Sequence, residues 1–73
     1  MNLYFSRHAK RQMKWRDISE EEVRTVLANP EMVIDSIRGR KKATRTIGEK
    51  SLEVVYKEEE NRVVIITAID RTR

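Results

Sequence analysis

The chain has 73 residues, no cysteine and a formal net charge of +4, with 16 lysines and arginines against 12 acidic residues. This length predicts one domain, residues 1–73, with a small core. The lack of cysteine excludes disulfides, thiolate nucleophiles and Cys-based zinc sites, and no segment approaches the roughly 18 apolar residues of a membrane span or reads as a signal peptide. We therefore expect a soluble, cytoplasmic protein with no membrane partner.

The first strong pattern is a basic helix from about Ser6, its N-cap, to about Arg16, after a short strand that the sequence allows at Asn2–Tyr4. Helical spacing places Ala9 and Met13 on one side. The other side carries a positive stripe made of Arg7, Lys10, Arg11 and Lys14. Such a face either meets an anionic partner or is simply solvated.

Two rings border this stripe. His8, the single histidine, belongs to the residue type whose ordinary pKa lies near neutral pH, so it is the natural candidate for acid–base catalysis. Trp15, the single tryptophan, can stack on unpaired bases. The alternatives are that His8 caps the helix or hydrogen-bonds to the sheet, and that Trp15 packs in the interior.

A second helix begins with a clear signature. Ser19 and Glu22 form a capping box, and Ile18 and Val23 occupy the positions of a hydrophobic staple. The predicted buried stripe consists of Val23, Val26 and Leu27, and Asn29-Pro30 is expected to end the helix.

Alternating patterns then predict a sheet. We expect strands over Met32–Ile37, Ala43–Ile47, Ser51–Lys57 and Arg62–Ile69, with a basic turn at Arg38–Lys42 between the first two. The last strand contains the most apolar run, Val63–Ile66, and is therefore expected inside the sheet rather than at its edge.

The predicted fold class is α+β, with two N-terminal helices packed on a three- to four-stranded antiparallel sheet. The helices cover one face, which leaves the other partly open. We expect that open, concave face to be lined by inward-pointing Arg45 and Tyr56 and by basic residues of the turn and the tail, namely Arg38, Arg40, Lys41, Arg71 and Arg73. The alternative for Tyr56 is a core position, because it shares a strand face with Leu52 and Val54.

Several segments carry a family resemblance: Phe5-Ser6-Arg7-His8-Ala9, Arg16-Asp17-Ile18-Ser19, Glu22-Val23, Asn29-Pro30 and Val64–Thr67. They resemble a family of short uncharacterised bacterial and archaeal proteins with an S-x-H-A helix, an R-x-I-S/T joint and a V-I-T strand. That family in turn is similar in fold and size to the RelE/ParE-type toxins of toxin–antitoxin modules.

The resemblance implies metal-independent cleavage of RNA, often messenger RNA on the ribosome, with an antitoxin protein covering the active surface. On this hypothesis His8, Arg45 and Tyr56 are the candidate catalytic residues, and the stripe, Trp15, the basic turn and the tail arginines bind RNA. Two alternatives stay open: a non-catalytic, inhibitory protein-binding module of the ParE type, and a simple nucleic-acid-binding domain. No residue cluster predicts a metal or cofactor, and the sequence leaves the oligomeric state open.

Overall fold

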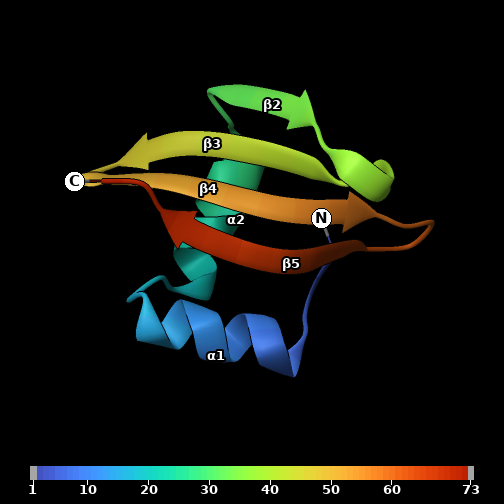
Figure 1. Ribbon diagram of the computed structural model, residues 1–73, viewed down its shortest axis with the longest axis horizontal. Coiled ribbons are helices and arrows are strands. Elements are labelled where there is room, and N and C mark those ends of the chain that lie inside the picture. The colour runs from blue at the N-terminus through green and yellow to red at the C-terminus, as the bar shows by residue number, and fades with distance from the viewer. Residues whose placement is uncertain (1, 73) are drawn as a thin grey trace.

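The computed structural model describes residues 2–72, and its elements follow the order predicted from the sequence (Figure 1). They are β1 (Leu3–Phe5), α1 (Arg7–Trp15), α2 (Glu20–Ala28), β2 (Met32–Asp35), the short 3-10 helix η1 (Ile37–Gly39), β3 (Lys41–Ile47), β4 (Lys50–Glu58) and β5 (Val63–Asp70). The α+β class with two helices before the main sheet is confirmed.

The sheet differs from the expected one in size and direction. It has five strands in the order β1-β5-β4-β3-β2, and it is mixed rather than antiparallel because β1 pairs parallel with β5, with Leu3 opposite Val63 and Phe5 opposite Ile65. The first and last strands therefore lie side by side. This places β5 between β1 and β4, as its apolar run predicted.

Helix α1 begins at the predicted cap. The Ser6 side-chain oxygen accepts a hydrogen bond from the Ala9 N–H at 3.1 Å, which satisfies one of the free donors of the first turn. Ala9 and Met13 are buried, and the helix ends at Trp15. Asp17 follows with a φ of 56°, a left-handed conformation that turns the chain toward α2.

Helix α2 carries both hydrogen bonds of the predicted capping box. The Ser19 hydroxyl accepts from the Glu22 N–H at 3.0 Å, and the Glu22 carboxylate accepts from the Ser19 N–H at 2.9 Å. Val23 and Val26 are buried, and the helix stops before Asn29-Pro30. The predicted start and end of this helix are confirmed.

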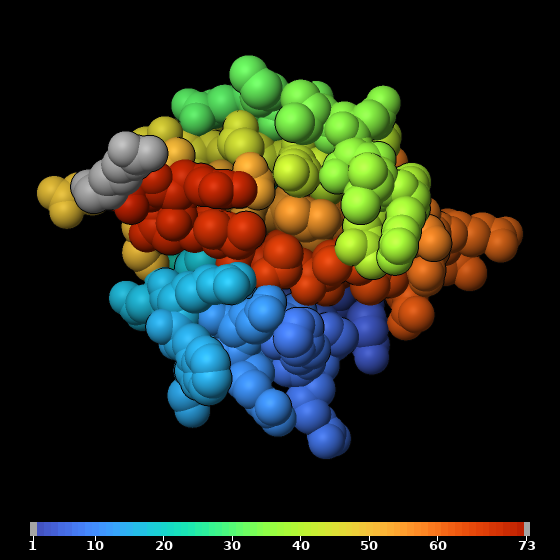
Figure 2. All heavy atoms as spheres, viewed as in Figure 1, coloured from blue at the N-terminus to red at the C-terminus, as the bar shows by residue number. Residues whose placement is uncertain are grey.

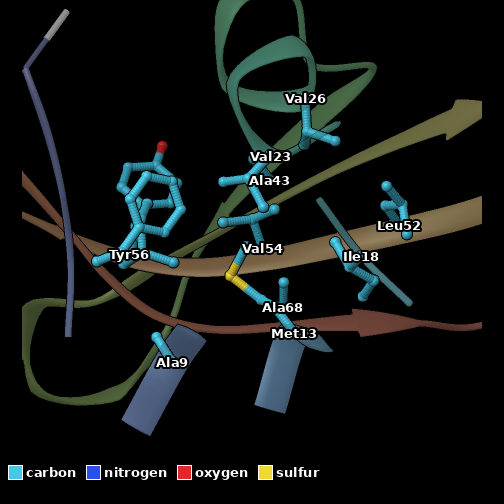
Figure 3. Packing of buried hydrophobic residues seen from close by; sticks show 12 residues of the cluster. Ala9, Met13, Ile18, Val23, Val26, Ala43, Leu52, Val54, Tyr56 and Ala68 are labelled. Atoms are coloured by element: carbon cyan, nitrogen blue, oxygen red, sulfur yellow. The ribbon is translucent and has the colours of Figure 1, made fainter. Parts of the chain in front are cut away.

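The helices enclose one core against the sheet (Figure 3). Side chains of α1 and α2 meet strand residues that share the α2-facing side of β3, β4 and β5: Ala9, Met13, Val23, Val26, Ala43, Leu52, Val54, Tyr56, Ile65 and Ala68. Helix α2 contacts β3 and β4, whereas α1 contacts β5. The opposite side of the sheet, which we call the open face, carries the alternate residues of these strands.

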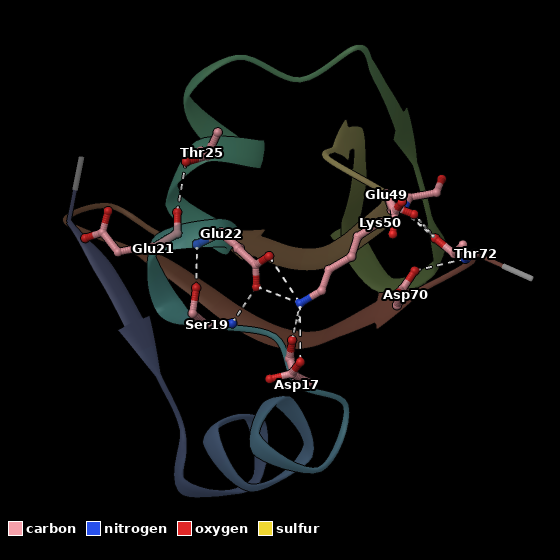
Figure 4. Close-up of polar contacts among 10 residues, drawn as sticks. Asp17, Ser19, Glu21, Glu22, Thr25, Glu49, Lys50, Asp70 and Thr72 are labelled. Carbon is pink, nitrogen blue, oxygen red and sulfur yellow. Dashed lines mark hydrogen bonds and ion pairs between the residues drawn. The ribbon is translucent and has the colours of Figure 1, made fainter.

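Lys50 ties the joint between the helices to the β3–β4 hairpin (Figure 4). Its ammonium group donates to the Asp17 carbonyl and to the Glu22 carboxylate, the latter at 3.2 Å. Mainly because the Ser19 N–H donates to this carboxylate, the pKa of Glu22 is lowered, against the opposing effect of burial and with further help from Lys50.

The strand predicted over Met32–Ile37 is shorter than expected. It ends at Asp35, and the chain then forms η1, where Arg38 and Gly39 both have positive φ, 60° and 73°. This backbone conformation breaks the extended pattern that the apolar residues had suggested. Ile37 is consequently exposed instead of lying in the sheet.

Candidate nucleic-acid interface

The outer side of α1 forms a shallow, open pocket of about 670 Å³. Its lining consists of Arg7, Lys10, Arg11, Lys14 and Trp15, which are the predicted stripe and its bordering indole. Figure 2 looks onto the open face of the sheet, with the blue residues of α1 along one side of it. We call the surface formed by these five residues of α1 the α1 stripe.

Trp15 is 83% exposed, so the alternative in which it packs in the interior is wrong. Ala9 and Met13 already fill the buried side of α1, and Trp15 comes too far around the helix to join them. An exposed indole on a small domain presents a large flat ring to solvent. It can stack on a planar ligand without rearrangement of the core.

The four cations of the α1 stripe have no acidic partner within ion-pair distance anywhere in residues 2–72. Two other candidate cations, Lys41 and Arg71, differ in this respect. Lys41 pairs with Glu58 at 2.9 Å, which raises the pKa of Lys41, and Arg71 pairs with Glu53 at 3.2 Å. The α1 stripe therefore carries four positive charges that no carboxylate of the described residues compensates.

His8 is exposed on the same helix. It lies three residues before Arg11 and seven before Trp15, so the three side chains share one side of α1. Among the described residues, none forms a hydrogen bond with its imidazole, and the cap of the helix is Ser6. The alternative in which His8 caps the helix is therefore wrong.

A hydrogen-bonded network locks α1 onto β5. The Arg16 guanidinium donates to the Thr67 hydroxyl and to the Ala68 carbonyl, both at 3.0 Å, and the Thr67 hydroxyl donates to Gln12 Oε1 at 2.7 Å. Because Arg16 directly follows Trp15, this network fixes the helix turn that carries the indole. Sequence reasoning missed Gln12 and Thr67, since their spacing of 55 residues gives no local signal.

The second basic segment lies at η1, away from α1. Arg38 is exposed, Arg40 is partly buried, and neither has an ion-pair partner within the part of the chain that the structure describes. In Figure 2 the yellow-green residues around η1 project on the side of the open face. Arg73 lies outside the described residues.

The structure does not bring Arg45 and Tyr56 together with His8. Arg45 shares a face of β3 with buried Ala43, on the α2 side, and its guanidinium donates to the Asn29 carbonyl at 2.9 Å, where α2 ends. Tyr56 is 9% exposed in the core, and burial raises its pKa. For Tyr56 this is the core position that its shared face with Leu52 and Val54 predicted, whereas the side chain of Arg45 lies on the helix-covered side and not on the expected open face.

Neither a metal site nor a membrane span emerges from the described residues. Within 2–72, no three histidine or carboxylate side chains gather closely enough to hold a metal ion. None of the helices in that range has the length and apolarity needed to cross a bilayer.

Comparison with known proteins gives one match. The family model described as "Domain of unknown function (DUF4258)" matches residues 5–70. No curated protein and no solved structure matches the chain significantly. The match begins just before α1 and ends with β5, so it covers both helices and four strands of the sheet in full.

Proposed function

Because this chain belongs to the DUF4258 family, a domain family of unknown function, we propose its function from the geometry of the α1 stripe: it binds single-stranded RNA. The observation that carries the proposal is an 83% exposed Trp15 flanked by four cations without acidic partners in the described structure. Cations contact phosphates, and an exposed ring stacks on an unpaired base.

A single strand suits this surface better than a duplex. In a duplex the bases are stacked on one another, so an indole that projects from a helix has no free base to cover. In a single strand each base offers a free face, and stacking on an aromatic side chain supports binding without strong sequence preference. Exposed Arg38 in η1 and partly buried Arg40 just after it offer additional phosphate contacts to an RNA that extends across the open face.

The resemblance to RelE/ParE-type toxins favours RNA over DNA as the ligand. On this proposal the RNA is messenger RNA, free or on the ribosome, in the cytoplasm, and an antitoxin protein competes for the α1 stripe. The ParE-type alternative is a protein-binding surface at the same place, and it makes a different prediction because the partner would then carry acidic side chains.

The decisive experiment compares two double variants that remove the same charge. Lys10→Ala with Lys14→Ala should weaken binding of a fluorescent single-stranded RNA and flatten the dependence of log Kd on log salt by roughly 1.4, about 0.7 per lost phosphate contact. Arg24→Ala with Arg62→Ala, on α2 and before β5, should change the slope little. Equal losses from both variants would assign binding to net charge and remove α1 from the site.

Cleavage of the bound RNA is a second candidate function, favoured by the exposed His8 beside Arg11. An imidazole can take the 2′-hydroxyl proton as the 2′-oxygen attacks phosphorus, a neighbouring guanidinium can stabilise charge on the phosphate, and the 5′-oxygen released when its bond to phosphorus breaks takes a proton from water. His8→Ala should then abolish cleavage, followed on a gel, while Kd and the melting temperature stay near those of the parent protein. An intact cleavage rate in this variant would leave a binding protein without catalysis by His8.

A further inference from the structure

Strand β5 contains one extra residue, which changes the direction of the Thr67 side chain. The pairing with β4 jumps from Ile65 to Thr67, so Ile66 is the extra residue. Strict alternation from buried Ile65 would turn Thr67 toward the core. Instead Ala68 is fully buried, and Thr67 lies on the open-face side, opposite Val55 of β4. Such bulges redirect side chains, commonly next to functional sites.

The redirected Thr67 hydroxyl holds two side chains of α1. It accepts a hydrogen bond from Arg16 Nη1 at 3.0 Å and donates one to Gln12 Oε1 at 2.7 Å. Arg16 Nη1 also donates to the Ala68 carbonyl at 3.0 Å, on the part of β5 that lies beyond its pairing with β1. Both protons of Nη1 are therefore used to attach α1 to β5.

The other nitrogens of the Arg16 guanidinium are not used in this way. Nε and Nη2 carry the remaining N–H groups, and no group within residues 2–72 accepts a hydrogen bond or forms an ion pair with them. Nε–H and one Nη2–H point in parallel and match two oxygens of a phosphate. Because Nη1 is held, this pair of donors is already oriented, so a ligand immobilises less of the side chain on binding.

The position of Arg16 on α1 places these donors next to the α1 stripe. His8, Gln12 and Arg16 follow one another at intervals of four residues, so they form one row along the helix. This row separates the α1 stripe from the side of α1 that packs against β5. Figure 2 shows the blue residues of α1 directly beside the red residues of β5 on the viewed face. An RNA that runs from the α1 stripe to the open face has to cross this row.

We propose that Arg16 binds an RNA phosphate through Nε and Nη2, with Thr67 as the positioning residue, and that this contact joins the α1 stripe to the open face. The inference rests on the proposed function and adds a contact outside the α1 stripe. Gln12 contributes a neutral donor beside it, because the bond from Thr67 to Oε1 leaves the Gln12 Nε2 protons for the ligand.

Nuclear magnetic resonance of the arginine side chains tests the contact directly. On addition of a short single-stranded oligouridine to the ¹⁵N-labelled parent chain, the Arg16 Nε–H signal should shift and exchange more slowly with water, because a phosphate oxygen accepts its hydrogen bond. Arg16→Lys identifies the signal by its loss. The Nε–H signal of Arg24, exposed on α2, should not move.

The outcomes separate this inference from the proposed function. If the RNA binds, and Lys10→Ala with Lys14→Ala weakens binding, an unmoved Arg16 signal would refute the Arg16 contact and leave the α1 stripe as the binding surface. If the parent chain does not bind the RNA, both proposals fail.

The salt dependence of binding distinguishes a phosphate from a base edge. Arg16→Ala should flatten the slope of log Kd against log salt by about 0.7, the value for one phosphate contact with a single strand. Arg24→Ala should leave the slope unchanged. An unchanged slope for Arg16→Ala would refute the phosphate contact.

Thr67 is tested without a change of charge. Thr67→Val removes the hydroxyl that holds Arg16 and should raise the Kd for oligouridine by at least roughly threefold, measured well below the melting temperature of the variant. Thr67→Ser retains the hydroxyl and should bind nearly as tightly as the parent chain. A valine variant with the parent Kd and the parent shift of the Arg16 signal would refute the positioning role.

Discussion

Trp15 shows that the sequence can leave open whether a helix residue lies in the core or on the surface. Its neighbours in sequence predicted either a core residue or the border of a basic stripe, and composition favoured the core because the chain has only four aromatic residues. The outcome depends on which side of α1 meets β5: that side carries buried Ala9 and Met13, and the bonds of Gln12 and Arg16 to Thr67 hold it in place. Local periodicity identified the stripe and places Trp15 away from Ala9 and Met13, and the structure shows that no other described element covers the indole.

Substitution of this indole separates stacking from charge. Trp15→Ala should weaken single-stranded RNA binding by about 1–3 kcal/mol, the usual contribution of one base–aromatic stack, measured by fluorescence anisotropy. The melting temperature should change little because the side chain is 83% exposed. Trp15→Phe retains an aromatic face and should recover part of the affinity; an alanine variant that binds as tightly as the parent would exclude stacking at this position.

At the scale of elements, local signals predicted helices better than strands. The caps of α1 and α2 involve residues three positions apart, so the sequence displays them directly. The parallel pairing of β1 with β5 joins residues 60 positions apart, Leu3 and Val63. No turn connects these two strands directly, so no turn motif in the sequence predicts their pairing. The register shift between β4 and β5 gives no local sequence signal either. Val55 pairs with Thr67 but Tyr56 with Ile65, which leaves one extra residue in β5 between the two partners.

The capping box makes the stability of α2 dependent on pH. The lowered pKa of Glu22 means that its ionised form stabilises the fold, so this contribution is complete above the unfolded value of 4.5 and is lost as the pH falls through the lower folded pKa. Glu22→Gln retains an acceptor for the Ser19 N–H but not the charge near Lys50. We expect it to reduce the free energy of unfolding by about 0.5–1 kcal/mol at neutral pH.

The deficit of this variant should shrink as the pH is lowered from neutral to well below 4.5, because Glu22 of the parent chain itself becomes protonated as the pH falls through its lowered pKa. Urea unfolding at the two pH values measures the difference. Glu21→Gln is the matched control, because Glu21 lies in the same first turn but forms no ion pair in the described structure. A deficit that is the same at both pH values would show that the charge of Glu22 does not stabilise α2.

At the scale of the whole molecule, the sequence predicted the class of fold and the basic character of α1, but not how its charged segments assemble. Arg45 and Tyr56 illustrate the limit: alternation correctly gave each a face of its strand, yet only the packing of α2 decides that this face is covered. The sequence likewise gives no sign that Lys41 and Arg71 have acidic partners. In the fold, Lys41 pairs with Glu58 and Arg71 with Glu53.

The parallel pairing of the first strand with the last also constrains how the chain is made. Ala9 and Met13 of α1 pack in one core with Ile65 and Ala68 of β5. The apolar side of α1 therefore lacks this packing partner until β5 has been synthesised. Contacts of such long sequence separation form late. A nascent chain whose β5 is still inside the ribosomal exit tunnel therefore carries its cationic helix unanchored, and α1 can dock only once the chain has emerged past Asp70.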